Sequence, residues 1–273
     1  MASDSERLRL LTRNRGFAAL WTSAFISIIG DRVHAVALAA LVYQMTGSLT
    51  ETGIAFVATA LPDLVLGLFA GVFVDRWDRR WILIACDLAR VPFVLLIPIV
   101  ASNSLLLVYV LLFIVNGLSV IFRPAKTALI PSVVRPSELA AANSLASIGE
   151  NTSDVIGYPL AGVILGVFTN WLGPEAGIMA AFAFDAATYL ISALLIRWVP
   201  PSRQALEDEA APPLSVWSDL REGLAFVRAT PVIRANTLVT LLGPLALGAV
   251  TPLLVGFAWE VLEGGDWAYA MLG

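Results

Sequence analysis

The stretch GVFVDRWDRR, residues 71–80, places two acids and three arginines in its last six positions, directly after an apolar run. The preceding residues are nearly uncharged, and the sequence that follows is apolar again. Such a cluster either lies in a surface loop of a soluble protein or forms the turn between two membrane-crossing helices. The composition of the whole chain decides between these two interpretations.

The composition is typical of a membrane protein. The chain has 273 residues, of which 58% are hydrophobic and only 14% are charged, and its mean hydropathy is +0.82. Soluble domains are typically about 45–50% apolar and about 25% charged. We therefore expect the charged cluster at 71–80 to connect two membrane-crossing helices.

The sequence lacks residues that several classes of protein need for their function. The net charge is −4, and no basic stripe is interleaved with aromatic residues, so no nucleic-acid partner is expected. Cys86 is the only cysteine, which excludes a disulfide within the chain, and a lone His34 excludes histidine-based zinc motifs. Lys126 has no upstream glycine pattern of a phosphate-binding loop. We expect neither an enzyme nor a bound metal or cofactor.

Apolar runs along the chain are long enough to cross a bilayer. A helix needs roughly 20 residues, at about 1.5 Å each, to span about 30 Å of hydrocarbon. The sequence predicts seven such helices, over residues 17–44, 53–74, 81–100, 104–123, 140–168, 177–198 and 232–257. The predicted fold class is an all-α integral membrane protein.

Basic residues occur in alternate connections between these runs. Arginines precede the first run, follow the second, and lie between the fourth and fifth and between the sixth and seventh. The connections TGSLTET, ASN and TNWLGPEAG contain none. By the positive-inside rule, we expect the N-terminus and the arginine-containing loops to be cytoplasmic. All basic residues except Lys126 are arginine, as in GC-rich bacterial genomes, so we expect a multi-pass protein of the bacterial cytoplasmic membrane.

The longest connection divides the chain into three parts. We expect a six-helix bundle over 1–198, a cytoplasmic linker over 199–231 and the start of a second half over 232–273. The linker begins with the proline-rich, charged VPPSRQALEDEAAPP. Its later part, SVWSDLREGLAFVRA, has the pattern of an amphipathic helix, which would lie either at the membrane surface or against the bundle.

The spacing of the charged cluster resembles a known signature. The pattern Gly71-x-x-x-Asp75-Arg76-x-x-Arg79-Arg80 is similar to the loop between helices two and three of the major facilitator superfamily. Asp78 departs from that signature, which usually has glycine there. The stretches LVYQMTGSLTETG, FRPAKTALIPSVV, FDAATYLISALLI and LREGLAFVRATPVIR resemble the drug, macrolide and siderophore exporters of that superfamily.

The resemblance implies a fold, an activity and a role for the cluster. It implies a major-facilitator-type six-helix bundle followed by a linker and a seventh helix, in a transporter of small molecules. It also implies that the cluster acts as a conformational latch between two halves of six helices each; the latch residues are Gly71, Asp75, Arg76, Arg79 and Arg80. Because twelve helices are usual in this superfamily, we expect a truncated form that needs a second half-transporter or forms a homodimer.

Polar residues inside the apolar runs are the candidate site. A charge at mid-membrane costs about 2.5–3.5 kcal/mol on insertion scales, so it normally faces a cavity or a partner. Glu150, Asp154 and Tyr158 recur at four-residue steps, which places them on one face of one helix. We expect this face to line water or a substrate path. Two partly desolvated carboxylates four residues apart should also repel each other, so one of them is a candidate for binding a proton.

Further candidates lie on other helices. Asp31, near mid-depth in the first run, is a third candidate for proton coupling; alternatively, it pairs with a basic residue, either Arg32 or one on a neighbouring helix, and serves architecture. Asn116 is a candidate substrate contact. The sequence differs at two positions from the pattern of proton antiporters in this superfamily. Phe113 stands where many antiporters have an arginine, and Tyr158 replaces a glycine before Pro159. Both differences bear on the mechanism of proton coupling.

Three of the remaining membrane-depth charges, Asp87, Arg90 and Asp185, are expected to be structural, while the role of Asp63 stays open. Asp87 and Arg90, three residues apart, suit an ion pair on one helix face. The resemblance places Asp185 at the bundle's periphery, where it would be structural too. His34 is either a pH-sensitive group or, more commonly for a lone histidine beside an acid, a satisfied neighbour.

The function expected from residues and resemblance together is proton-coupled efflux of amphipathic small molecules. The partners would be a small-molecule substrate, protons and the lipid bilayer. Two alternatives stay open: an importer or facilitator of the same superfamily, and a membrane fragment that transports nothing alone.

Overall fold

The structure is a computed structural model that describes residues 4–200, 221, 225–239 and 242–243. Within these residues every regular element is helical. The elements are α1 (Asp4–Arg13), α2 (Arg15–Thr46), α3 (Leu49–Arg76), α4 (Arg79–Ala101), α5 (Leu105–Val133), the short 3₁₀ turn η1 (Pro136–Glu138), α6 (Leu139–Leu172) and α7 (Pro174–Ile196). Residues 225–229 and 231–239 are helical as well.

The predicted all-α membrane architecture is confirmed. Six helices, α2 to α7, are long and apolar enough to cross a membrane, and they coincide with the first six predicted runs. Most of the predicted linker, and the seventh run beyond residue 243, lie outside the described residues.

The helices begin at residues whose side chains cap them. Asn14 accepts a hydrogen bond of 3.0 Å from the Phe17 amide at the start of α2, and Ser48 accepts one of 3.3 Å from the Glu51 amide at the start of α3. Asp78 accepts one of 2.8 Å from the Arg80 amide at the start of α4. Such caps satisfy amides that have no partner within the helix. The aspartate that departs from the superfamily signature therefore caps α4.

One predicted boundary is wrong. The fourth run was expected to end at 123, with Arg123 and Lys126 in a cytoplasmic loop, whereas α5 continues to Val133. The apolar run ends at Arg123, but the helix continues for ten more residues and contains both Pro124 and Pro131. Membrane helices tolerate proline where neighbouring groups satisfy the freed backbone.

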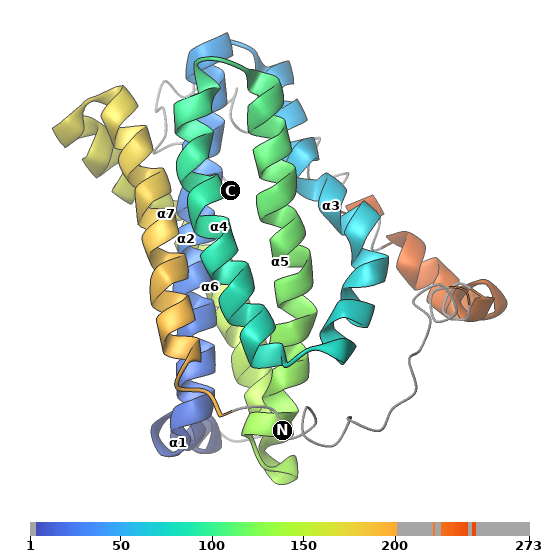
Figure 1. Cartoon of the computed structure of the whole chain (residues 1–273). Helices are drawn as coiled ribbons and strands as arrows, with labels where there is room; N and C mark the ends of the chain where they lie inside the picture. Colours follow the sequence, from blue (N-terminus) through green and yellow to red (C-terminus); the bar gives the residue numbers. More distant parts are fainter. Residues whose placement is uncertain (1–3, 201–220, 222–224, 240–241, 244–273) are drawn as a thin grey trace.

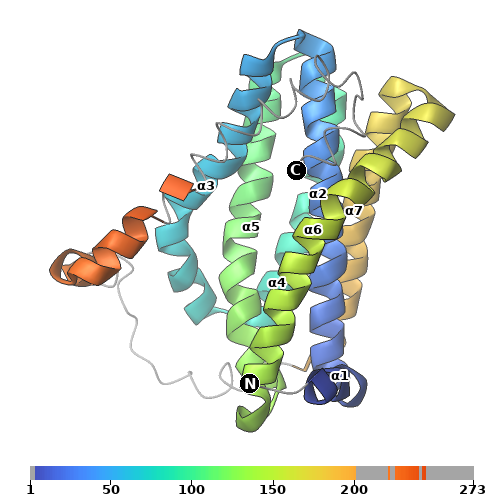
Figure 2. The same cartoon turned by 180° about the vertical axis from the view of Figure 1, so that it is seen from behind.

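The six long helices form an arc rather than a closed ring. Side by side they follow the order α3, α5, α4, α7, α2, α6, while α5 and α6 touch only sparsely (Figure 1). α3 bows outward from the bundle and returns to it where α4 begins (Figure 2). The connections α2–α3, α4–α5 and α6–α7 lie at one end, at the top of Figure 1, and α1 lies at the other. The concave side of the arc is bordered by α2, α3, α5 and α6.

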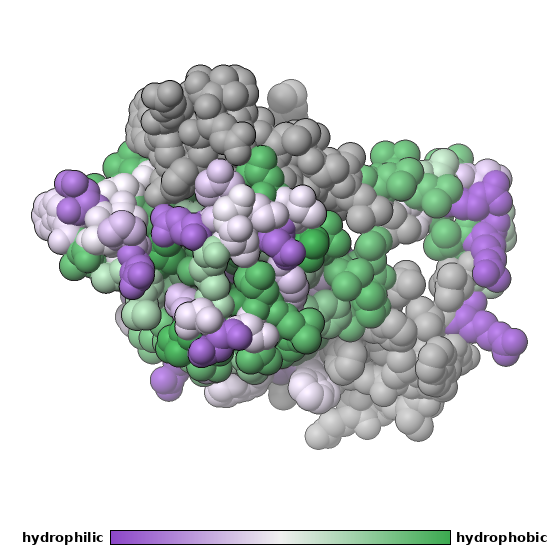
Figure 3. Space-filling model, turned by 90° about the horizontal axis from the view of Figure 1, so that it is seen from above, coloured by the Kyte–Doolittle hydropathy of each residue, from purple (hydrophilic) through white to green (hydrophobic). Residues whose placement is uncertain are grey.

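The bundle is apolar both inside and outside. Its interior holds buried residues such as Val33, Leu83, Leu112, Leu129 and Phe182. Large hydrophobic side chains also remain exposed on the outer faces of α4, α5 and α7. Seen from the upper end, hydrophobic residues form much of the coloured surface, with hydrophilic residues interspersed among them (Figure 3). Extensive exposed apolar surface of this kind suits contact with lipid.

Candidate functional site

A cavity of about 610 Å³ occupies the concave side of the arc. Its walls come from α2, α3, α5 and α6, with Arg90 of α4 and Tyr189 of α7 reaching it from behind. The structure brings all five candidate site residues together in this cavity: Asp31, Asn116, Glu150, Asp154 and Tyr158. Cavities of this size, between helices, are typical of small-molecule sites.

Arg32 of α2 binds two of the candidates on α6. Its Nη2 lies 2.5 Å from Asp154 Oδ1, and its Nη1 donates to Tyr158 Oη at 3.0 Å. The guanidinium also stacks over the Tyr158 ring, 4.9 Å from the centroid. A Cβ on Gly157 would lie 2.8 Å from Arg32 Cγ, so any larger residue at this position would push the arginine side chain away from α6.

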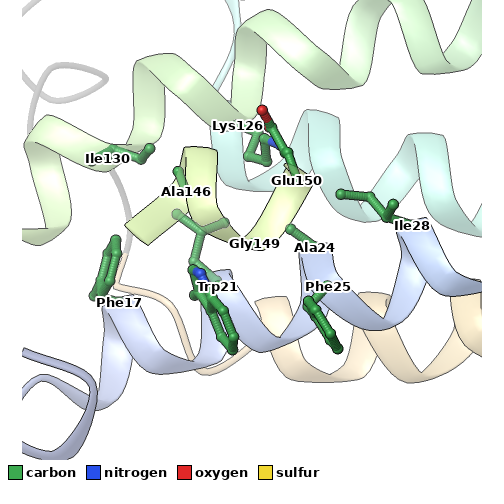
Figure 4. Close-up of a pocket in the computed structure, with 11 residues that line it drawn as sticks. Phe17, Trp21, Ala24, Phe25, Ile28, Lys126, Ile130, Ala146, Gly149 and Glu150 are labelled. Carbon is green, nitrogen blue, oxygen red and sulfur yellow. The ribbon is translucent and has the colours of Figure 1, made fainter. Parts of the chain in front are cut away.

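Lys126 of α5 binds the remaining candidate on α6. Its Nζ lies 2.6 Å from Glu150 Oε1, and the two side chains meet above a small pocket of about 20 Å³ (Figure 4). Trp21 and Phe25, stacked with centroids 5.3 Å apart, lie on the α2 side of this pocket. Glu150 and Asp154 thus each face a cation from a different helix, rather than only each other as the spacing on α6 suggested.

A third ion pair joins α3 to α5. Arg123 Nη2 contacts Asp63 Oδ1, and both residues line the cavity. The three pairs connect α3 to α5, α5 to α6 and α6 to α2, so each crosses a boundary between helices. Motion of one wall relative to another must stretch or break one of them.

Asp31 has a different kind of partner. Tyr189 Oη donates to Asp31 Oδ1 at 2.6 Å, from α7 to α2. Behind it, the Arg90 guanidinium lies between two rings, 4.7 Å from the Phe122 centroid and 4.9 Å from that of Tyr189. The expected alternative, in which Asp31 pairs with Arg32, does not occur: Arg32 binds Asp154 instead.

The structural charges expected from the sequence are buried beside the cavity. Arg90 Nη1 lies 3.6 Å from Asp87 Oδ1, as the three-residue spacing predicted. His34 Nδ1 lies 3.0 Å from Asp185 Oδ2, joining α2 to α7. Asp87 and Asp185 are fully buried. The expected position of Asp185 at the bundle's periphery is therefore wrong, because its side chain lies in the contact between α2 and α7. The histidine's neighbour is thus an acid from a distant part of the sequence rather than Asp31.

Asn116, the candidate substrate contact, lies on the α5 wall. Its Nδ2 donates to the Leu112 carbonyl at 2.9 Å within the same helix. This bond uses only one of its amide hydrogens, and the side chain also lines the cavity, so its carbonyl oxygen and second hydrogen suit a polar ligand.

Two arginines of the predicted latch, Arg79 and Arg80, bind backbone carbonyls of their own bundle. Arg79 Nη1 donates to the Ala128 carbonyl of α5 at 3.0 Å, and Arg80 Nη2 donates to the Arg197 carbonyl, just after α7, at 2.6 Å. Gly71 has open space around its α-carbon among the described residues. Asp75 and Arg76 lie at the end of α3, where only the backbone is described. The latch role itself stays a prediction.

The described part of the lining carries four cations and four carboxylates. The cations are Arg32, Arg90, Arg123 and Lys126, and the carboxylates are Asp31, Asp63, Glu150 and Asp154. Among the described residues, no group of three or more histidine, cysteine or acidic side chains could hold a metal ion. The arrangement offers ion-pair partners and aromatic faces for a polar or charged molecule, and carboxylates that can exchange protons.

Sequence reasoning missed the cationic half of this site. Hydropathy places Arg123 and Lys126 in a loop, because the apolar run ends at Arg123. Arg32 was considered only as a possible partner of Asp31. A usable signal was present in the sequence: acids and bases both occur at membrane depth, where isolated charges are costly, so pairing between helices was to be expected.

Comparison with known proteins extends these observations. The family model described as "Transmembrane secretion effector" matches residues 11–273. The uncharacterized MFS-type transporter YfiS of Bacillus subtilis (strain 168) is 27% identical over 272 residues, which cover 97% of this chain and 62% of YfiS. The multidrug efflux pump Tap of Mycolicibacterium fortuitum is 30% identical over 254 residues, covering 87% of this chain and 56% of Tap. The chain thus spans little more than half the length of these relatives.

A solved structure has the same fold. The crystal structure of a bacterial homologue of the human lysosomal transporter Spinster, in an inward-facing conformation, superposes with a TM-score of 0.66 at 17% sequence identity. The match covers 99% of this chain and 59% of that protein.

Proposed function

Because the chain belongs to the transmembrane secretion effector family of major facilitator transporters, we propose that it serves in proton-coupled efflux of amphipathic small molecules. The cavity between α2, α3, α5 and α6 is the observation that carries this proposal, since it collects the membrane-depth polar residues in one place. Its lining combines charges with the aromatic rings of Phe56, Phe122, Tyr158 and Tyr189, which suits molecules that are partly apolar and partly charged.

The direction of transport is proposed from the relatives. Tap is by name a multidrug efflux pump and is similar to 87% of this chain. An importer or facilitator would use the same cavity, so only the direction of substrate movement separates these functions.

The ion pairs suggest how a proton and a substrate could compete. Protonation of Asp154 or Glu150 would remove the charge that holds Arg32 or Lys126. The freed cation could then bind an acidic group of a substrate, or the walls of the cavity could separate. In this proposal Asp31, Glu150 and Asp154 are the coupling candidates, and Asn116 and Tyr158 contact the substrate.

The remaining parts of the proposal concern topology and partners. We propose a bacterial cytoplasmic membrane location with a cytoplasmic N-terminus, which puts Arg79 and Arg80 on the cytoplasmic side. The latch residues Gly71, Asp75, Arg76, Arg79 and Arg80 would act against a second six-helix half, because superfamily sites lie between two such halves. That half would come from the same protein, a second half-transporter or a homodimer.

A dye-efflux assay tests the function. Cells that produce the protein encoded by the complete gene are loaded with ethidium, energised, and followed by fluorescence with and without a protonophore. We expect efflux that stops when the proton gradient is dissipated, and we expect residues 1–273 alone to give none. Undiminished efflux under the protonophore would contradict proton coupling, and net uptake in energised cells would contradict export.

Matched carboxylate variants connect the assay to the cavity. Asp154→Asn removes a carboxylate that binds Arg32 in the cavity. Glu175→Gln removes an exposed carboxylate in the first turn of α7, which does not line the cavity. We expect the first variant to lose efflux and the second to retain it. Equal activity in both would place the transport path elsewhere.

A further inference from the structure

We propose that His34 of α2 and Asp185 of α7 form a proton-binding site beside the cavity, distinct from the ion-paired carboxylates that line it. His34 Nδ1 lies 3.0 Å from Asp185 Oδ2. Asp185 is fully buried, whereas His34 is largely buried but belongs to the cavity lining. One partner therefore meets the transport path while the other is shielded. The site's role in coupling rests on the proposed function, but proton binding itself does not.

Each partner keeps a polar atom free for a proton. Among the described residues, neither His34 Nε2 nor Asp185 Oδ1 has a hydrogen-bond partner, although both atoms are buried. Buried polar atoms are nearly always hydrogen bonded, and exceptions are found where a group has chemical work to perform. Asp87 and Arg90, buried close by, also have unpartnered polar atoms. The pair at His34 and Asp185 differs from them in that His34 lines the cavity.

Proton uptake by the pair can be written atom by atom. In one state, neutral His34 donates its Nδ1 hydrogen to the Asp185 carboxylate, and the pair carries one negative charge. An incoming proton binds at His34 Nε2 or Asp185 Oδ1, and the pair becomes neutral overall. Loss of the proton from the same atom restores the first state.

The charges around the pair favour a bound proton. Two buried carboxylates, those of Asp87 and Asp185, share this region with one buried guanidinium, that of Arg90. An excess of negative charge at membrane depth is unfavourable, and a proton reduces it. The helices packed around the pair carry further titratable and charged groups. In the membrane-depth part of these helices they include Asp31 and Arg32 on α2, Cys86, Asp87 and Arg90 on α4, Glu150, Asp154 and Tyr158 on α6, and Tyr189 on α7.

The backbone of α2 makes room for the buried acid. A Cβ on Gly30 would lie 2.6 Å from Asp185 Oδ1 and 2.0 Å from Thr188 Oγ1. Gly30 lies one turn before His34 on α2, and only a glycine there leaves room for the Asp185 carboxylate against the helix backbone. The close approach of the two helices is thus built around the carboxylate.

The carboxylates of α6 lie in a different setting. Asp154 and Glu150 are each half exposed, with 52% of the side chain accessible, and each is in contact with a cation. The pair at His34 and Asp185 has no cation in direct contact among the described residues other than the histidine itself.

Nuclear magnetic resonance of the imidazole tests proton binding directly. His34 is the only histidine in the chain, so protein labelled with ¹⁵N at histidine shows the signals of this ring alone. Residues 1–273 in lipid nanodiscs are titrated over roughly pH 5 to 8, the range in which histidine exchanges protons. We expect one protonation step in the wild-type protein. Ring signals that stay constant over the whole range would overturn the proposal.

Substitutions on α7 assign the step to the pair. Asp185→Asn should shift or abolish the step, while Glu175→Gln, an exposed carboxylate on the same helix, should leave it unchanged. An unchanged step in folded Asp185→Asn would contradict the assignment. If that variant does not fold, Asp185→Glu keeps the charge but moves the oxygens; a shifted midpoint then supports the pair and an unchanged one contradicts it.

The coupling role has a separate readout. In the protein encoded by the complete gene, His34→Gln and Asp185→Asn should lose the response of efflux to the proton gradient but retain downhill dye exchange. If the wild type itself shows no such response, the proposed function fails while the titration result stands. If the wild type responds and both variants respond equally, the coupling role is contradicted.

Discussion

Arg32 and Asp154 meet across the cavity with Nη2 2.5 Å from Oδ1, although 122 residues separate them in the sequence. The Tyr158 hydroxyl accepts a second hydrogen bond from the same guanidinium, which also stacks over the face of the Tyr158 ring. One arginine therefore ties the first long helix of the bundle to the fifth, at the height where the candidate site residues gather.

Glycine at position 157 should be needed for this contact. Gly157→Ala places a Cβ 2.8 Å from Arg32 Cγ, so the arginine must move and its bonds to α6 weaken. Overpacking of this kind typically costs about 1–3 kcal/mol. We expect a lower melting temperature in detergent for this variant. Gly166→Ala, on the same helix with open space around it, should melt like the wild type, and equal destabilisation by both would contradict the explanation.

Removing the arginine should expose the carboxylate rather than unfold the protein. Arg32→Gln leaves Asp154 without its cation, but Asp154 borders the cavity and remains accessible to water. We expect a folded protein by circular dichroism whose efflux falls by about tenfold, equivalent to about 1.4 kcal/mol. Arg32→Lys should recover only part of this loss, because lysine cannot bind Asp154 and Tyr158 with a planar fork. Full activity in Arg32→Gln would exclude the pair from transport.

The cap of α4 gives a prediction about stability. Asp78→Ala removes the side chain that accepts from the Arg80 amide at 2.8 Å. Loss of an N-cap costs about 0.5–2 kcal/mol, whereas asparagine caps about as well as aspartate. Asp78→Ala should therefore melt at a lower temperature than Asp78→Asn. Identical melting of the two variants would mean that the cap contributes nothing here.

Cysteine labelling tests the proposed topology. Asn103, between α4 and α5, and Trp77, between α3 and α4, lie at opposite ends of the bundle (Figure 1). In intact cells we expect an impermeant maleimide to label Asn103→Cys but to label Trp77→Cys only after permeabilisation. The native Cys86 is buried and should react with neither treatment. The reverse labelling pattern would invert the proposed orientation.

The membrane architecture could be predicted from the sequence because hydrocarbon imposes a length on every helix that crosses it. Each of α2 to α7 coincides with an apolar run, and the exposed leucines and isoleucines of α4 and α7 show that lipid, not water, is the outer solvent. The end of α5 could not be predicted in the same way. Hydropathy marks where apolar residues stop, and Arg123 and Lys126 remain helical because they find acids across the cavity.

The candidate site was predicted in part. The four-residue repeat of Glu150, Asp154 and Tyr158 placed them on one face, and they do line one cavity. Their partners could not be predicted, because periodicity within one helix says nothing about which helix lies opposite. The pairing of His34 with Asp185, 151 residues away, depends on the contact between α2 and α7 and is invisible to any local pattern.

The equal numbers of cationic and anionic side chains around the cavity have an electrostatic consequence. With four of each sign among its described residues, the lining itself contributes little net charge, so it should draw in neither cations nor anions from a distance. Entry rates of charged cargo should then depend only weakly on ionic strength. Neutralising any one of these side chains would leave a net charge on the lining. The cavity would then favour substrates of one charge sign over those of the other.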